Sequence, residues 1–140
     1  MMRLRRLHWP APALSYLADT LSKRPMPGIS IHVVDTTRGV PAAGMCIEIF
    51  ALAPERRLIA KGALAQSGAL EHPVSRERFS PGAYEVLFHA GDFFASAGVS
   101  QASPPFLDVV PFRFQITDPD QHYHLPMKIT PWGFSIYRGS

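Results

Sequence analysis

Histidine and lysine side chains gather in one short segment near the end of the chain, from His122 to Lys128. Side chains alternate across a β-strand, so His122, His124 and Lys128 share one face if this segment is extended. Two imidazoles that converge can activate a water molecule and protonate a leaving nitrogen near neutral pH. His32, in an earlier apolar run, is a candidate for the second imidazole. The spacing therefore indicates either histidine-assisted hydrolysis or the solvent face of a sheet that carries surface histidines.

Other classes of site have weaker support in the sequence. Two histidines two positions apart plus a third could bind zinc, but no second cysteine accompanies them, and we expect no metal. The chain has neither a Gly-x-Ser-x-Gly elbow nor a glycine-rich phosphate loop. The lone Cys46 has no partner for a disulfide within the chain, and we expect it to be a small buried apolar side chain.

The elements that must position the histidines are short strands. From Ile29 onward, apolar runs rich in β-branched and aromatic residues alternate with clusters of Pro, Gly, Asp and Ser. The pattern predicts strands over residues 29–35, 46–53, 58–63, 84–89, 109–117, 123–129 and 134–137. A short helix fits residues 91–98, and the lack of any long helical pattern argues against a parallel α/β fold. The sequence therefore predicts an all-β sandwich.

Length and composition limit the chain to one globular domain, because it has 140 residues of which 46% are hydrophobic. The net charge of +3 comes with one dense basic cluster, close to the N-terminus, so we expect no nucleic-acid partner. No apolar stretch approaches the roughly 18 residues that span a bilayer, and we expect a soluble, cytoplasmic protein without a membrane partner. Residues 1–27 are basic and then rich in proline, which predicts an N-terminal arm ahead of a domain over 28–140.

Several longer motifs occur together in this chain. They lie at residues 31–36 (Ile-His-Val-Val-Asp-Thr), 39–44, 88–95, 105–107, 118–126 and, at the C-terminus, 137–140 (Tyr-Arg-Gly-Ser). In this combination the chain resembles the transthyretin-like family, and the terminal tetrapeptide resembles its 5-hydroxyisourate hydrolase branch.

The resemblance implies an antiparallel sandwich of seven to eight strands with one short helix. It also implies a homotetramer, built as a dimer of dimers, that binds its small-molecule substrate at the dimer–dimer interface. The implied reaction opens a ring amide of 5-hydroxyisourate to give 2-oxo-4-hydroxy-4-carboxy-5-ureidoimidazoline in urate degradation, without a cofactor.

The same resemblance assigns roles to individual residues. Matching motif to motif, the catalytic residues are His32 and His124. The residues expected to bind substrate are Tyr137, Ser140, Lys128, His122 and Arg138.

One departure from the family concerns its Asp-Gly-Arg motif, because Ala69 stands where the arginine is expected. Loss of a donor aimed at an oxyanion costs on the order of a hundred-fold in rate. Lys128 could replace the lost charge, reshape the pocket for a different substrate, or lie in solvent at a subunit rim. Three functions therefore stay open: the hydrolase, an enzyme repurposed for another cyclic ureide, lactam or nitrogen heterocycle in a biosynthetic pathway, and a non-catalytic small-molecule binder.

Overall fold

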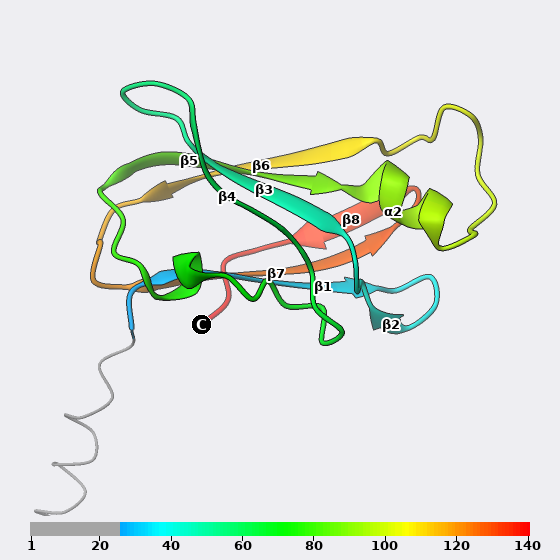
Figure 1. Cartoon of the computed structure of the whole chain (residues 1–140), viewed down its shortest axis with the longest axis horizontal. Helices are drawn as coiled ribbons and strands as arrows, with labels where there is room; N and C mark the ends of the chain where they lie inside the picture. The colour runs from blue at the N-terminus through cyan, green and yellow to red at the C-terminus, as the bar shows by residue number, and fades with distance from the viewer. Residues whose placement is uncertain (1–25) are drawn as a thin grey trace, which may run out of the picture.

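The computed structural model describes residues 26–140, which fold as a sandwich of two four-stranded sheets (Figure 1). One sheet has the order β2-β1-β7-β8 and the other β4-β3-β5-β6. The strands are β1 (Gly28–Asp35), β2 (Val40–Pro41), β3 (Cys46–Ala51), β4 (Arg57–Ala63), β5 (Gly82–His89), β6 (Val109–Ile116), β7 (His122–Thr130) and β8 (Gly133–Ile136). A short helix, α2 (Ala90–Ser96), follows β5. The predicted all-β sandwich with one short helix is confirmed.

Two small elements had no signal in the sequence. Strand β2 has two residues, which is too short for an alternating pattern to appear. The 3-10 helix η1 (Pro73–Arg76) begins after His72, whose Nδ1 accepts a hydrogen bond from the backbone N–H of Val74 at 3.1 Å. Both elements lie in connections between longer strands.

The core forms because apolar side chains alternate with polar ones along the strands of both sheets. On β7, Tyr123 and the alternate residues that follow it are almost fully buried, while His122, His124 and Lys128 face outward. The predicted division of this strand into two faces is therefore correct. The largest fully buried side chains are Phe88, Phe94, Ile29, Ile31, Met45, Ile47, Ile49, Leu125, Met127 and Ile129.

Strands β1 and β7 run parallel, whereas the other strand pairs named in the two sheets are antiparallel. The predicted antiparallel sandwich therefore contains this one parallel pair. Parallel neighbours need a long crossover connection, and here the entire second sheet lies between β1 and β7 in the sequence. The register places Ser30 opposite His124, His32 opposite Pro126 and Val34 opposite Lys128. It thereby joins the two histidine-bearing strands side by side.

The expected N-terminal arm over residues 1–27 lies outside the described residues except for its last two, and it stays a prediction. Strand β1 begins at Gly28, where the expected domain begins. Within residues 26–140, no helix has the length and apolar character needed to cross a membrane.

Candidate active site

Three side chains from β1 and β7 form a hydrogen-bonded cluster on the outer face of the β2-β1-β7-β8 sheet. The Ser30 hydroxyl oxygen lies 2.7 Å from His122 Nε2 and 2.8 Å from His124 Nδ1. The second ring nitrogen of His122, Nδ1, lies 3.1 Å from the carbonyl oxygen of Met26. All three side chains are half-buried, so both imidazoles are held in place but remain accessible.

His32 lies in the adjacent row of the same face and is held by the segment 65–70. Its Nε2 donates to the carbonyl oxygen of Ser67 at 2.8 Å. The backbone N–H of Val33 donates to the Gly68 carbonyl at 2.9 Å, which fixes this segment along the edge of β1. Gly68 has φ +81°, and a Cβ there would lie 2.6 Å from the Val33 carbonyl oxygen, so the close approach requires glycine.

Ala69 occupies the position directly opposite His32. The two residues form an isolated antiparallel bridge, flanked by the Val33–Gly68 bond and by a 3.0 Å bond from Leu70 N to the Ile31 carbonyl. Directly opposed residues of this kind place their side chains on the same face, with Cα atoms about 4.5 Å apart. The methyl group of Ala69 is therefore beside His32, and a longer side chain at this position would extend over the histidine face.

The C-terminal residues pack against His124. The backbone N–H of Gly139 donates to the His124 carbonyl at 2.7 Å, and a Cβ on Gly139 would lie 2.6 Å from His124 Cδ2. Figure 1 shows the C-terminus beneath the β1–β7 sheet, on the side away from the second sheet. Tyr137 and Ser140, the neighbours predicted to bind substrate, are both exposed.

Arg138 makes contacts with β7 and the turn before it. Its guanidinium lies 4.2 Å from the centre of the Tyr123 ring and donates to Gln121 Oε1 at 2.7 Å. Both contacts fix the side chain at the end of β7 where Gln121 precedes the strand. A substrate-binding role for Arg138 stays a prediction.

Lys128 is exposed on the same face as the histidines. A strand rises about 3.3 Å per residue, so its Cα lies about 13 Å along β7 from that of His124. Pro126, the partner of His32 in the register, lies halfway between them. Lys128 is therefore one row away from His32 and two rows away from His124 on this face.

The electrostatic setting of His124 favours its neutral form. Burial of the ring lowers the pKa of His124 below its ordinary value, and repulsion from the protonated forms of His122 and His32 lowers it further. A neutral imidazole has one nitrogen with a free lone pair, so His124 has the protonation state of a general base.

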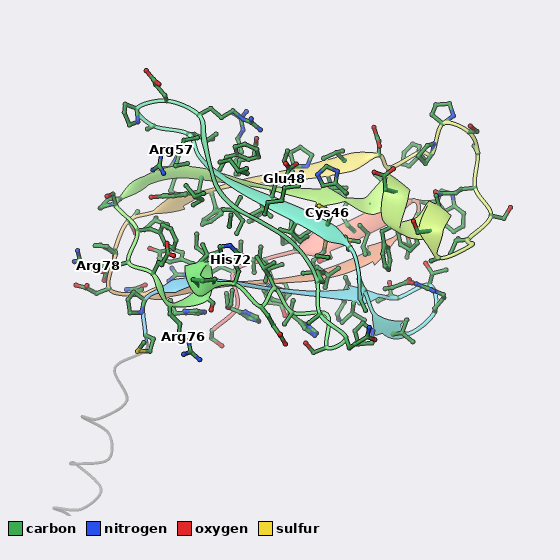
Figure 2. The ribbon with its side chains drawn as sticks, in the orientation of Figure 1. Cys46, Glu48, Arg57, His72, Arg76 and Arg78 are labelled. Atoms are coloured by element: carbon green, nitrogen blue, oxygen red, sulfur yellow. The ribbon has the colours of Figure 1, made fainter. Side chains whose placement is uncertain are left out.

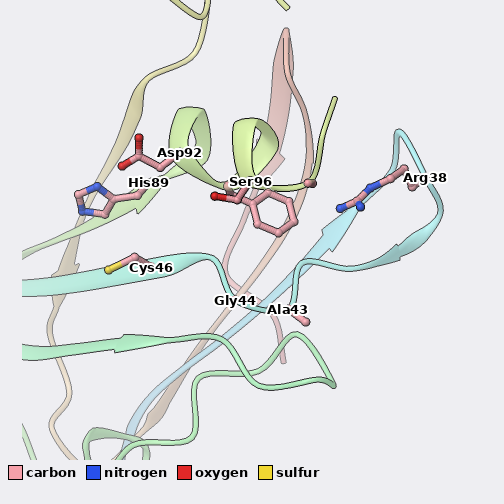
Figure 3. A pocket seen from close by; sticks show the side chains of 9 residues that line it. Arg38, Ala43, Gly44, Cys46, His89, Asp92 and Ser96 are labelled. Atoms are coloured by element: carbon pink, nitrogen blue, oxygen red, sulfur yellow. The ribbon is translucent and has the colours of Figure 1, made fainter. Parts of the chain in front are cut away.

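A separate cavity of about 310 Å³ lies between α2, the start of β3 and the turn after β1 (Figure 3). Cys46 lines it and is half-buried, so the expectation of a buried Cys46 was wrong. His89, also in its lining, lies 2.7 Å from Glu48, and this hydrogen bond lowers the pKa of the Glu48 carboxyl. Figure 2 shows Cys46 and Glu48 on the upper sheet, and none of the predicted site residues lines this cavity. Within residues 26–140, no group of three or more His, Cys, Asp or Glu side chains could hold a metal ion.

Comparison with known proteins identifies the family. The HIUase/Transthyretin family matches residues 29–139, which is nearly all of the described chain. The chain belongs to this family. A relative named 5-hydroxyisourate hydrolase 2, from Rhizobium meliloti (strain 1021), is 43% identical over 114 residues, covering 80% of this chain and 95% of the relative.

Two solved structures support the family assignment. The 5-hydroxyisourate hydrolase of Klebsiella pneumoniae superposes with a TM-score of 0.67 at 28% identity, over 80% of this chain and 98% of that one. An (S)-allantoin synthase superposes with a TM-score of 0.74 at 38% identity, over 88% of this chain. The match covers 48% of the synthase, so this chain spans about half of that protein.

In this member of the HIUase/Transthyretin family, Ser30 is the site residue that sequence reasoning missed. Its hydroxyl contacts two of the predicted histidines. The available signal was its spacing, because Ser30 lies two residues before His32 and therefore shares its strand face. Nothing in the sequence showed that the same face continues onto β7.

Proposed function

We propose that this protein hydrolyses 5-hydroxyisourate, opening one ring amide to give 2-oxo-4-hydroxy-4-carboxy-5-ureidoimidazoline in urate degradation. The observation that carries the proposal is the placement of His32 and His124 in adjacent rows of one sheet face, with the C-terminal residues packed against His124. Relatives that match almost end to end carry the name of this activity.

In the proposed mechanism, the two histidines move protons and no covalent nucleophile is needed. Neutral His124 accepts a proton from a water molecule while the oxygen of that water attacks the ring carbonyl carbon. The carbon–nitrogen bond of the resulting tetrahedral intermediate then breaks, and an imidazolium returns the proton to the leaving nitrogen. His32 lies in the neighbouring row and is the second group that can carry out this transfer.

The intermediate carries a negative oxygen, which requires a donor or a cation on the same face. Ala69 offers neither, although it lies beside His32. We propose that Lys128, which lies on the same face one row from His32, supplies this charge, while Tyr137 and Ser140 form the wall of the pocket. His122 and Arg138 are further candidates for contact with the substrate.

We further propose that four copies assemble as a dimer of dimers, with the sites at the dimer–dimer interface. The support is the open histidine face together with exposed aromatic side chains around β8: Trp132, Phe134 and Tyr137 are 60%, 47% and 55% exposed in the single chain. Light scattering after size-exclusion chromatography would test the tetramer. We propose the cytoplasm as the site of action, which fractionation of cells would test.

The test of the proposed function is the decay of 5-hydroxyisourate generated in the cuvette by urate oxidase and followed in the ultraviolet. We expect the wild-type protein to accelerate decay, His124→Ala to lose the acceleration, and His89→Ala to keep it. His89 is a suitable control because it is a half-buried histidine on the other sheet. Decay at the spontaneous rate with wild-type protein would contradict the proposal.

If 5-hydroxyisourate decays only at the spontaneous rate, Ala69 and Lys128 favour a second candidate function. The loss of the family's arginine and the gain of a lysine on the same face fit an enzyme repurposed for another cyclic ureide or lactam. Binding of such compounds without turnover would indicate the non-catalytic binder instead.

A further inference from the structure

We propose that Ser30 and His122 form a positioning chain that selects the tautomer of His124 and leaves its Nε2 as the proton acceptor. Four groups take part in the chain, in the order Met26 carbonyl, His122, Ser30 and His124. The catalytic consequence rests on the proposed function, whereas the tautomer itself is a property of the free protein.

The positioning chain begins at a group that can only accept a hydrogen bond. The Met26 carbonyl oxygen lies 3.1 Å from His122 Nδ1, so this nitrogen must carry the hydrogen. In a neutral imidazole the other nitrogen then holds a lone pair. His122 Nε2 is therefore an acceptor, and the hydroxyl group 2.7 Å away, that of Ser30, must donate to it.

The Ser30 hydroxyl has a single hydrogen, and His122 takes it. Toward His124 the hydroxyl oxygen can then only accept, so His124 Nδ1, at 2.8 Å, must carry a hydrogen and donate. Neutral His124 is left with its lone pair on Nε2. With His122 neutral, the opposite orientation of the hydroxyl would leave two lone pairs facing each other at 2.7 Å.

The chain also offers a route for the proton that His124 gains. When Nε2 takes a proton from water, Nδ1–H can pass its proton to the Ser30 oxygen as Ser30 passes its own to His122 Nε2. His122 then carries the positive charge, and His124 is neutral with its hydrogen on Nε2. The reverse shift follows when Nε2 gives that hydrogen to the leaving nitrogen, so every proton is accounted for.

The fold holds the chain of groups in place. The parallel register puts Gly28 opposite His122 and Ser30 opposite His124, so Ser30 lies beside two histidines that are two residues apart on β7. Gly139 closes against the carbon side of the His124 ring, where a Cβ would lie 3.4 Å from Cγ and closer still to Cδ2. The ring is therefore fixed between the serine hydroxyl and the C-terminal backbone.

Nitrogen-15 NMR of histidine-labelled protein near pH 8, without substrate, tests the tautomer directly. We expect His124 and His122 both to carry hydrogen on Nδ1, and Ser30→Ala to move His124 toward the Nε2–H form. Ser30→Thr should restore the wild-type pattern because it keeps the hydroxyl. A wild-type His124 with hydrogen on Nε2, or one that does not respond to Ser30→Ala, would overturn the proposal.

Kinetics with enzymatically generated 5-hydroxyisourate test the consequence. We expect Ser30→Ala to lower kcat at least tenfold with little change in KM, and Ser30→Thr to recover most of the loss. Ser96→Ala, at an exposed serine on α2, is the matched control. An unchanged kcat in Ser30→Ala would refute the positioning role even where the hydrolase is active. Inactive wild-type protein with the expected NMR pattern would refute only the proposed function.

Discussion

Replacing Gly139 with alanine should move His124 without disturbing the rest of the fold. The added Cβ would lie 2.6 Å from His124 Cδ2 and 3.3 Å from Pro126 Cδ. Non-bonded carbon atoms prefer about 3.5–4.0 Å, so the imidazole or the C-terminal backbone must move by about 1 Å. The backbone of Gly139 lies outside the positive-φ region, so alanine adds contact but no backbone strain.

The expected magnitude follows from this displacement. Misplacement of a catalytic group by 1 Å can cost about a hundred-fold in rate, equivalent to about 2.7 kcal/mol of transition-state stabilisation. We therefore expect Gly139→Ala to lower kcat/KM for 5-hydroxyisourate by on the order of a hundred-fold. The midpoint of thermal unfolding should change little, because Gly139 is close to the C-terminus and outside the core.

The matched control is Gly133→Ala, because a Cβ on Gly133 at the start of β8 would meet nothing within 4 Å. Decay of enzymatically generated 5-hydroxyisourate would be measured for both variants and the wild type at equal concentrations. If Gly139→Ala keeps kcat/KM within twofold of Gly133→Ala, then either His124 is not catalytic or the terminal backbone moves in its place. A nitrogen-15 NMR spectrum with an unshifted His124 ring would identify the second case.

Three other results are expected. Lys128→Leu should lower kcat/KM at least tenfold, and adding Ala69→Arg to that variant should restore it, because either cation would lie on the histidine face and stabilise the oxyanion. Unchanged steady-state kinetics in Lys128→Leu would exclude the idea that Lys128 replaces the lost arginine. Burial lowers the pKa of His124 from its ordinary value of 6.5, so activity should fall with falling pH only below that value, as a pH profile of kcat/KM of the wild type would show. Stability should also decrease as the pH falls from 6.5 toward the folded-state pKa, because the unfolded chain binds the proton first; chemical denaturation at several pH values, with His124→Gln as the control, would measure this loss. Phe88→Ala should destabilise the domain by about 3–5 kcal/mol in chemical denaturation, because it empties a fully buried site, and a loss below 1 kcal/mol would contradict the core assignment.

The local alternation of apolar and polar residues was sufficient to predict much of the fold. The division of β7 into a core face and a histidine face follows from side-chain geometry alone, and the same holds for His32 on β1. Strand positions also followed from apolar runs bounded by turn residues. These features depend on near neighbours in the sequence, which is why they could be predicted without a partner strand.

Features that depend on distant pairing could not be predicted in this way. The parallel register of β1 and β7 sets the contact of Ser30 with both histidines, and no local pattern encodes a register. The bridge between His32 and Ala69 likewise depends on how an irregular segment lies along a strand edge. Cys46 is half-buried because the cavity near α2 opens beside it, which its residue type does not indicate.

The pairing of β1 with β7 has a consequence for how the protein acquires activity. The bond between Ser30 and His124 joins residues 94 positions apart, whereas β3 and β4 are neighbours in the sequence. Contacts of such long range are closed late, because the entropy of the intervening loop must be lost first. A chain emerging from the ribosome can form the second sheet while its histidines are still apart. Turnover would then report completed folding, and a substrate analogue would rescue only variants in which β1 and β7 can still pair.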